Sequence, residues 1–344
     1  MTEAPFLPAG VSRPDAPSLS VIVPVFNEQD SIDTFLEHTF PPLIATGTDW
    51  SVVFINDGSN DQTLRVLIEA AKRTHRIRVV NLARNFGKEA ALTAGLDVID
   101  SDVCIIMDVD LQDPPELIPE FVDQWRKGFD VVYGVRAARR DDTALKRSTA
   151  GLFYRVFNKV SPTKIPENAG DFRLMDRRVV DAVKQLPERN RFMKGLFAWV
   201  GFPSTGVKFD RAPRAAGETK FKFRGLWNFA LDGLLSFSTM PLKAWTYVGA
   251  GLAVGAISYA GVVIAQTLIF GIAVPGYASL MVVLLLASAA QLLSLGVIGE
   301  YIARLTLEAK QRPIFLIEGQ YDRRSLLGGT DKSEDTTKGI DTAA

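Results

Sequence analysis

The chain has 344 residues, enough for one large domain with an appendage or for two domains. Its 39 Lys and Arg residues balance its 39 Asp and Glu residues, and a formal net charge of +0 provides no global field that would attract a nucleic acid. A single cysteine excludes a disulfide framework, which fits a reducing, cytoplasmic setting.

The chain begins with a segment that has no apolar core. Residues 1–17 are rich in proline, so we expect a flexible leader and no secretory signal. From residue 18 onward, short apolar runs alternate with helical patterns, which predicts an α/β fold with a mainly parallel sheet and helices on both faces. The predicted strands are 18–24, 51–55, 78–82, 103–107 and 130–134, and the predicted helices are 31–40, 61–74, 88–98 and 115–126.

Three of these strands, the first, second and fourth, end in polar clusters at residues 24–28, 56–61 and 108–116. Ligands of open α/β sheets bind at the carboxyl ends of the strands, so we expect the three clusters to share one site. Asp108 and Asp110 follow the fourth strand one residue apart, and such oxygen ligands suit Mg²⁺ or Mn²⁺ holding a substrate's phosphates. The alternative is a solvated acidic turn that caps the next helix.

The membrane signal lies in the last third of the chain. From Ala244 to Gly299 there is no Asp, Glu, Lys or Arg in 56 residues, far more than the ~20 residues that cross a bilayer. Pro275 interrupts this run, which predicts a transmembrane hairpin of two helices at 244–272 and 275–299. Basic residues on both flanks place the catalytic domain and both termini in the cytoplasm. The alternative is a very apolar soluble hairpin.

The remaining boundaries follow from composition. We expect a catalytic domain at 18–223, a juxtamembrane amphipathic helix at 224–243, a cytoplasmic helix and extension at 300–325 and a disordered tail at 326–344. A second amphipathic segment, 191–200, carries large apolar residues at helical spacing beside Arg and Lys. Each amphipathic segment either lies in the headgroup plane of a membrane or packs onto the sheet as a core helix.

Three segments together resemble the signatures of family 2 glycosyltransferases with the GT-A fold. They are V-P-V-F-N-E at 23–28, N-D-G-S-N-D at 56–61 and D-V-D-L-Q-D-P-P-E at 108–116. The chain is most similar to the polyprenyl-phosphate glycosyltransferases, a group that includes dolichol-phosphate mannose synthase and the bacterial undecaprenyl-phosphate glucosyltransferases. The resemblance covers roughly residues 18–240, and the predicted hairpin fits the bacterial, membrane-anchored branch.

The resemblance implies roles for individual residues. The nucleotide sugar would be bound by Pro24, Phe26, Glu28, Ile55, Asp57, Asp108, Val109, Arg136, Arg214 and Lys220. Asp108, Asp110 and Gln112 would hold Mg²⁺ or Mn²⁺, and the acceptor phosphate would meet Arg136, Arg173, Arg214 and Lys220. The catalytic residues would be Asp171, as a base, with Asp110 and Arg136.

Simpler interpretations of the same residues remain open. Asp171 can be a helix-flanking carboxylate paired with Arg173, and the other basic residues can be ordinary surface charge. Glu28 and Asp57 can be turn-capping residues alone.

The resemblance implies an inverting, metal-dependent transfer of a hexose from a nucleotide sugar to undecaprenyl or another polyprenyl phosphate. UDP-glucose is the first choice of donor, the bacterial inner membrane the expected location, and a homo-oligomer such as a tetramer the expected assembly. The alternatives are GDP-mannose, UDP-N-acetylhexosamine or amino-arabinose donors, and a non-catalytic, membrane-tethered protein that binds sugar nucleotides. The absence of Q-x-x-R-W disfavours a processive synthase, and the absence of G-x-x-x-x-G-K-[ST] and of an early G-x-G-x-x-G disfavours other nucleotide enzymes.

Overall fold

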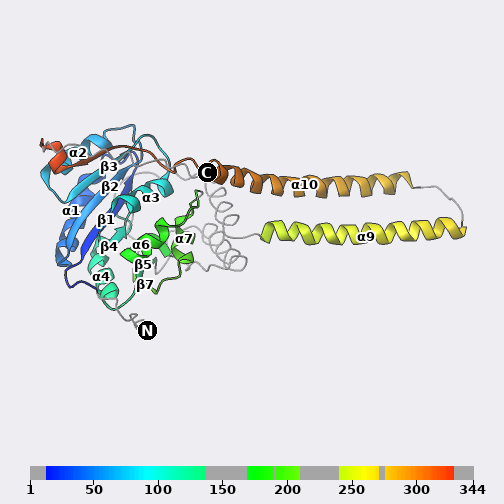
Figure 1. The fold of residues 1–344 in the computed structure, drawn as a ribbon, viewed down its shortest axis with the longest axis horizontal. Helices are drawn as coiled ribbons and strands as arrows, with labels where there is room; N and C mark the ends of the chain where they lie inside the picture. The colour runs from blue at the N-terminus through cyan, green and yellow to red at the C-terminus, as the bar shows by residue number, and fades with distance from the viewer. Residues whose placement is uncertain (1–12, 137–168, 190, 210–239, 271–275, 329–344) are drawn as a thin grey trace, which may run out of the picture.

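Apolar runs between turn residues form the first five strands, and the computed structural model shows them joined with three more in one sheet (Figure 1). It describes residues 13–136, 169–189, 191–209, 240–270 and 276–328. The strands are β1 (Ser18–Val25), β2 (Asp49–Asn56), β3 (Ile77–Leu82), β4 (Val103–Ile106), β5 (Val131–Arg136), β6 (Ala169–Asp176), β7 (Ser204–Phe209) and β8 (Ile317–Asp322). Their order across the sheet is β7-β5-β6-β4-β1-β2-β3-β8.

Helices cover both faces of the sheet, as the alternation of elements predicts. One apolar core lies under α1 (Ile32–Ala45), α2 (Thr63–Arg73) and α4 (Ile118–Arg126), the last preceded by a 3-10 turn at Pro115–Leu117. A second core lies under α3 (Lys88–Val98), α6 (Arg177–Lys184) and α7 (Met193–Trp199). The α/β class is therefore confirmed.

The sheet is mainly parallel, as predicted, but it is mixed because two strands are reversed. β6 runs antiparallel to both β4 and β5, and β8 runs antiparallel to β3. Neither strand is a continuous apolar run. In β6, Phe172 and Leu174 belong to one core and Met175 to the other, while Asp171 and Arg173 interrupt the apolar pattern. Such a segment forms a strand because its neighbours supply hydrogen bonds on both sides.

The amphipathic segment at 191–200 packs onto the sheet. Within α7, Met193, Leu196 and Phe197 are buried in the second core, whereas Trp199 is exposed. Of the two interpretations of this segment, the core helix is therefore confirmed. The expectation of more than one juxtamembrane amphipathic helix is wrong for residues 191–200. The other segment, predicted at 224–243, lies outside the described residues up to residue 239, and Met240 already belongs to α9.

The described chain begins with a buried residue. The guanidinium of Arg13 donates to Asp130 Oδ1 over 2.7 Å and lies 4.7 Å from the centroid of the Trp125 ring. Its side chain is only 7% exposed. Arg13, which falls within the predicted leader, is therefore held in place, because its cation is buried beside a carboxylate and an aromatic face.

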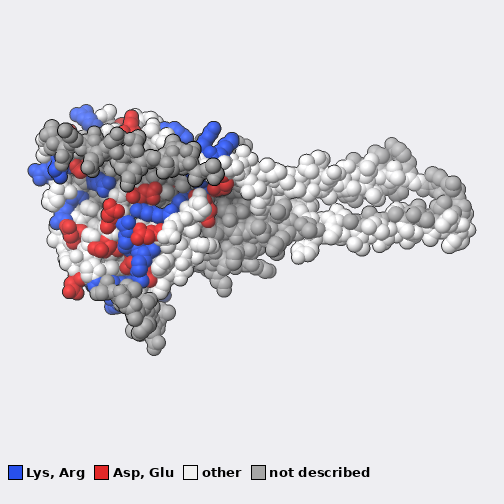
Figure 2. Space-filling view, viewed as in Figure 1, with Lys and Arg blue, Asp and Glu red and all other residues white. Residues whose placement is uncertain are grey.

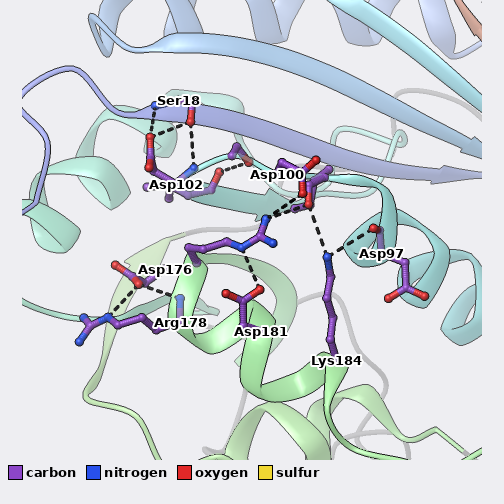
Figure 3. Close-up of polar contacts among 12 residues, drawn as sticks. Ser18, Asp97, Asp100, Asp102, Asp176, Arg178, Asp181 and Lys184 are labelled. Carbon is purple, nitrogen blue, oxygen red and sulfur yellow. Dashed lines mark hydrogen bonds and ion pairs between the residues drawn. The ribbon is translucent and has the colours of Figure 1, made fainter.

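The edge of the sheet at the amino ends of β1 and β4 is held by ordinary structural contacts (Figure 3). Asp102 accepts hydrogen bonds from the backbone N–H and the hydroxyl of Ser18, over 2.8 and 2.7 Å. Asp176 caps α6 by accepting from the backbone N–H of Arg178, and Lys184 reaches back to the carbonyl of Asp97. These contacts attach α6 to the sheet at the end opposite the polar clusters.

Two long helices extend from the α/β domain side by side, α9 (Met240–Phe270) and α10 (Tyr277–Ala309) (Figure 1). Charged side chains gather on the domain and are scarce along the helices (Figure 2). Among the described residues, one stretch, Leu286–Ala309, is long and apolar enough to cross a membrane, and the apolar stretch Tyr247–Tyr259 of α9 is shorter. The predicted two-helix hairpin therefore stays a prediction.

The segment after α10 returns to the domain. Glu308 accepts a hydrogen bond from the backbone N–H of Arg189 over 2.8 Å, and Phe315 packs against the second core. The chain then forms β8 and the short helix α11 (Arg323–Leu326). Of the predicted helix and extension at 300–325, residues 300–309 are helical and residues 317–322 join the sheet, and the predicted tail beyond residue 328 lies outside the described residues.

Candidate active site

The carboxyl ends of β2, β1 and β4 lie next to one another, because these strands are parallel neighbours. The loops that follow β1 and β2 are joined by hydrogen bonds. The backbone N–H of Asn27 donates to Ser59 Oγ over 2.9 Å, Asn27 Oδ1 accepts from the N–H of Asn60 over 2.8 Å, and the N–H of Glu28 donates to Thr63 Oγ1 over 2.9 Å. Two of the three polar clusters predicted above therefore form one surface.

Asp57 connects this surface to the loop between β3 and α3. Its two carboxylate oxygens accept hydrogen bonds from the backbone N–H groups of Phe86, at 2.7 Å, and Gly87, at 2.9 Å. Burial raises the pKa of Asp57, although these two N–H groups act in the opposite direction. Gly58 follows with φ +62°, and a Cβ there would lie 2.3 Å from the carbonyl carbon of Arg84. Only glycine fits this close approach of two loops.

The pair Asp108 and Asp110 follows β4, and both side chains are partly exposed. Asp110 Oδ1 accepts a hydrogen bond from the backbone N–H of Gln112 over 3.2 Å. Between them, Leu111 has φ +55°, a backbone conformation that costs a branched residue free energy and is most often kept at functional sites. This turn brings Gln112 back toward Asp110, on the loop that also carries Asp108.

The donor set of this loop fits a hard divalent cation. Two carboxylates and a carboxamide are the oxygen ligands that Mg²⁺ and Mn²⁺ prefer, and Mg²⁺ commonly binds one or two carboxylates and completes its coordination with water and phosphate oxygens. Among the residues that the structure describes, no group of three or more His, Cys, Asp and Glu side chains is arranged for a metal. A cation bound here would therefore depend on ligands from a substrate.

Asp171 lies beside Asp108 because β6 runs antiparallel to β4. Arg173 pairs with Ile106 in the sheet, so the residues just before Arg173 extend past the carboxyl end of β4. Lys88, the first residue of α3, joins the two acids: its Nζ lies 2.7 Å from Asp108 Oδ1 and 2.8 Å from Asp171 Oδ2. The ammonium of Lys194 lies 3.5 Å from Asp171 Oδ1.

These contacts set the charge of the cluster. Burial alone disfavours the ammonium of Lys88, but the carboxylates of Asp108 and Asp171 outweigh it and raise the pKa of Lys88. Burial likewise disfavours the carboxylate of Asp171, but Lys194 and Lys88 outweigh it and hold the pKa of Asp171 below its usual range. A carboxylate with a lowered pKa is a weak proton acceptor. The observed contacts of Asp171 therefore suit the orientation of two lysines better than the predicted role of a base.

Glu89 is a second acid that the sequence did not single out. It lies in the first turn of α3, and its Oε2 accepts a hydrogen bond from the backbone N–H of Met193 over 3.2 Å. Burial and the nearby charge of Asp171 raise the pKa of Glu89 to about 7. This contact links α3 to α7, which also carries Lys194. No spacing rule points to Lys88, Glu89 or Lys194, since their proximity depends on where β6 and α7 pack.

Two arginines named above have different surroundings. Arg136 ends β5 on the same edge of the sheet, and its buried Nε has no hydrogen-bond partner among the described residues. Arg173 is 6% exposed, donates to the carbonyl of Gly170 over 2.9 Å and stacks 4.4 Å from the centroid of the Phe197 ring. Within the described residues, Arg136 Nε thus keeps no hydrogen-bond partner, whereas the guanidinium of Arg173 is engaged in internal contacts.

Two apolar residues to which the resemblance assigns nucleotide binding are buried. Ile55 is 0% exposed and Val109 is 5% exposed, and both belong to the apolar cores. Their predicted role in nucleotide binding stays a prediction, and it would have to use their backbone groups. Pro24, near the end of β1, and Phe26 and Glu28, on the loop after it, are partly exposed. Arg214 and Lys220 lie outside the described residues.

Comparison with known proteins gives related chains. The model of the family described as Glycosyl transferase family 2 matches residues 20–184. An uncharacterized glycosyltransferase from Synechocystis sp. is 52% identical over 87% of this chain and 94% of its own length. A prophage bactoprenol glucosyl transferase homolog from Escherichia coli (strain K12) is 46% identical over 87% of this chain and 98% of its own length. A bactoprenol glucosyl transferase from Shigella phage SfV is 46% identical over 88% and 98%.

Among solved structures, glucosyl-3-phosphoglycerate synthase from Mycobacterium tuberculosis, in complex with Mn²⁺, UDP and glucosyl-3-phosphoglycerate, is 18% identical. The match covers 64% of this chain and 80% of that one, with a TM-score of 0.44. The sequence relatives are far more similar, and the matched family segment contains the loops after β1, β2 and β4. Since more than half of the residues are identical across almost the whole of one glycosyltransferase, the chain belongs to glycosyl transferase family 2 and is a glycosyltransferase.

Proposed function

We propose that the chain transfers a hexose, with inversion, from a nucleotide sugar to the phosphate of undecaprenyl phosphate or another polyprenyl phosphate, and that the nucleotide sugar is UDP-glucose. The observation that carries the proposal is the arrangement of Asp108 and Asp110 beside the cluster of Lys88, Asp171 and Lys194. Metal-binding carboxylates and two ammonium groups at one edge of a sheet suit a reaction between two phosphate-bearing substrates. The names of relatives at 46% identity support a bactoprenol-type acceptor and glucose.

The loops after β1 and β2 would receive the nucleoside. Phe26 and Pro24 are partly exposed apolar surfaces for a base, and Glu28, partly exposed on the loop after β1, would accept from base or ribose donors. Asp57 is 4% exposed and would act by holding the loop after β3 against this surface through the N–H groups of Phe86 and Gly87. The hydrogen bonds between Asn27, Ser59 and Asn60 hold these loops in one arrangement before a ligand arrives. A preformed site binds with less loss of conformational entropy.

The diphosphate would lie over the loop after β4. Asp108, Asp110 and Gln112 would hold the divalent cation, which when bound stabilises the negative charge of the departing nucleoside diphosphate. Lys88 is placed to contact a phosphate oxygen, because its ammonium lies at the surface between Asp108 and Asp171. Arg136 Nε, which has no hydrogen-bond partner within the described residues, supports a contact with a second phosphate.

The acceptor needs little activation. A lipid monophosphate has a second pKa of about 6, so its oxygen is largely ionised at neutral pH. That oxygen would attack the anomeric carbon, the bond from that carbon to the diphosphate would break, and no proton would need to move when the dianion reacts. Asp171 would then act by holding Lys88 and Lys194 toward the two phosphates, and not by accepting a proton.

The two long helices would bring this site to the membrane. In this proposal α9 and α10 form a transmembrane hairpin, with the domain on the cytoplasmic side where nucleotide sugars are made. The length and apolarity of Leu286–Ala309 support one span, and the side-by-side packing of α9 supports the second. An acceptor phosphate at the headgroup level would then lie within reach of a tethered domain.

The direct test is transfer of label into lipid. Detergent-purified full-length protein is incubated with Mn²⁺ or Mg²⁺, undecaprenyl phosphate and radiolabelled UDP-glucose or GDP-mannose, and label is counted in the organic phase. We expect transfer from UDP-glucose that is lost with Asp110→Ala and retained with Asp123→Ala, an acid exposed on α4 that pairs only loosely with Arg126. Nucleotide binding without transfer from either sugar would contradict the proposal and favour a non-catalytic binding protein.

A further inference from the structure

The segment that follows the two long helices completes the sheet next to the nucleotide loops. β8 pairs with β3 antiparallel, with Gln320 opposite Val80 and Gly319 opposite Asn81. The backbone N–H of Ala83 also donates to the carbonyl of Leu316 over 2.9 Å. In Figure 1 this strand continues from α10 and lies along the outer edge of the sheet. β8, which is distant in sequence, thereby lies beside β3, the strand that pairs with β2.

Four hydrogen bonds lead from this strand across the carboxyl edge of the sheet. Glu318 Oε2 accepts from Asn81 Nδ2 over 2.6 Å, and Asn81 Oδ1 accepts from Asn56 Nδ2 over 2.6 Å. Asn56 Oδ1 accepts from Ser59 Oγ over 2.6 Å, and Ser59 Oγ accepts from the backbone N–H of Asn27 over 2.9 Å. The chain of contacts, here called the asparagine relay, connects β8 to the loop after β1.

The direction of every bond in the asparagine relay follows from its two ends. An ionised carboxylate only accepts hydrogen bonds, and a backbone N–H only donates them. With Glu318 at one end and the N–H of Asn27 at the other, each amide and hydroxyl between them donates one bond and accepts one, and only one orientation of each amide allows this. Asn56 is 1% exposed and Asn81 is 4% exposed, so water is poorly placed to replace a lost partner.

The end of the relay lies at a left-handed turn. Asn27 has φ +54°, in the region that asparagine adopts more readily than most residues other than glycine. It stands between Phe26 and Glu28, which are proposed above to receive the base and ribose. The backbone conformation at Asn27 therefore sets where these two side chains point. Its N–H bond to Ser59, which the relay orients, is one of the two contacts that hold it.

We propose that Glu318 is a positioning residue for the nucleotide sugar, acting through the asparagine relay on the loop that carries Phe26 and Glu28. The inference rests on the proposed function for the identity of the ligand. Replacing Glu318 by Ala leaves the amide of Asn81 without its acceptor and frees both asparagines to reorient, which loosens the hold on Ser59 and Asn27. Glu318 is itself exposed on an edge strand, so its replacement leaves the apolar cores intact.

The test uses full-length protein in detergent and measures two quantities, the Kd for UDP with Mn²⁺ by calorimetry and the KM values for UDP-glucose and undecaprenyl phosphate. For Glu318→Ala we expect the Kd and the KM for UDP-glucose to rise about fivefold, the lower end of couplings between linked sites. The KM for undecaprenyl phosphate and kcat should stay within about twofold, since the metal loop and the lysine cluster are untouched.

Three further variants separate positioning from mere stability. Glu318→Gln retains an acceptor oxygen and should restore both values, whereas Glu318→Asp keeps the charge, is shorter by one methylene and should resemble Glu318→Ala. The matched control is Gln320→Ala. It removes a neighbour on the same strand whose side-chain oxygen accepts, among the described residues, from the partly exposed Arg78 over 2.9 Å, and it should bind UDP like the wild type.

Unchanged UDP affinity in Glu318→Ala, with a wild type that binds UDP, would overturn the inference and leave the proposed function standing. Equal losses in Glu318→Ala and Gln320→Ala would overturn it too, because they would show a general effect of the strand. A wild type that binds neither UDP nor GDP would overturn the inference together with the proposed function.

Discussion

Replacement of Glu89 by Gln tests the electrostatics of the site. The carboxylate of Glu89 accepts from the N–H of Met193, and a Gln oxygen at that position can accept the same bond without the charge. Burial and the charge of Asp171 raise the pKa of Glu89 from 4.5 to about 7. The folded protein therefore binds this proton more tightly than the unfolded chain does. The free energy of unfolding falls as pH rises from the pKa of Glu89 in the unfolded chain to its pKa in the folded protein. Above that pH the loss stays constant.

The size of this effect follows from the difference between the two pKa values. A rise from 4.5 to about 7 is about 2.5 units, and at about 1.36 kcal/mol per unit this gives an upper limit of about 3 kcal/mol. Because the Glu89 side chain is partly exposed, the actual effect lies below this limit. Removing the charge should therefore stabilise the protein at pH 8 by up to about 3 kcal/mol and at pH 5 by less than about 1 kcal/mol.

The assay is thermal unfolding of the full-length protein in detergent at the two pH values. A domain of this size changes its Tm by about 2–4 °C per kcal/mol, so Glu89→Gln should raise Tm at pH 8 by up to about 10 °C. Glu37→Gln, which changes an exposed residue of α1, serves as the control and should show no such pH dependence. A Glu89→Gln variant whose advantage is equal at pH 5 and pH 8, or absent at both, would refute the reasoning.

Four other outcomes follow from the contacts of the site and the core. Lys88→Met, which removes the ammonium shared by Asp108 and Asp171, should slow transfer about 10²-fold in initial-rate assays, whereas Lys72→Met, at an exposed pair, should not. Gly58→Ala should lower Tm and weaken UDP binding, since its Cβ would lie 2.3 Å from backbone. Arg13→Ala should cost about 2–3 kcal/mol in chemical unfolding, because the buried Asp130 then keeps only Arg178 as a partner. Chelation with EDTA should abolish transfer, and added Mn²⁺ or Mg²⁺ should restore it; transfer that persists in EDTA would contradict the metal site.

The sequence is sufficient to predict those parts of the fold that depend on local pattern. β1, β2 and β4 each contain an unbroken apolar run that polar residues close, so both the strands and the shared edge at their carboxyl ends were predictable. β6 and β8 were not, because Asp171 and Arg173 in one, and Glu318 and Gln320 in the other, hide any apolar alternation. Their pairing is decided by neighbouring strands that the segment itself does not reveal.

The same distinction applies within the site. Asp108 and Asp110 are adjacent in sequence, so their proximity needed no tertiary information. The approach of Lys88 to Asp171 spans 83 positions and exists only because β6 is inserted beside β4. Burial was equally hidden: Ile55 follows the pattern of a strand end, but the packing of α3 against the sheet decides that its side chain is enclosed.

The position of β8 also bears on how the protein is made. The side chains of Asn81 and Glu318 meet although they are 237 positions apart. At about 5–20 residues per second of synthesis, β3 waits between about 10 and 50 s for its outer partner, and both long helices emerge from the ribosome in that interval. An unpaired edge strand is prone to associate with other chains. A product truncated after α10 would therefore be not an unanchored enzyme but an unfinished sheet, exposed to aggregation and to proteases.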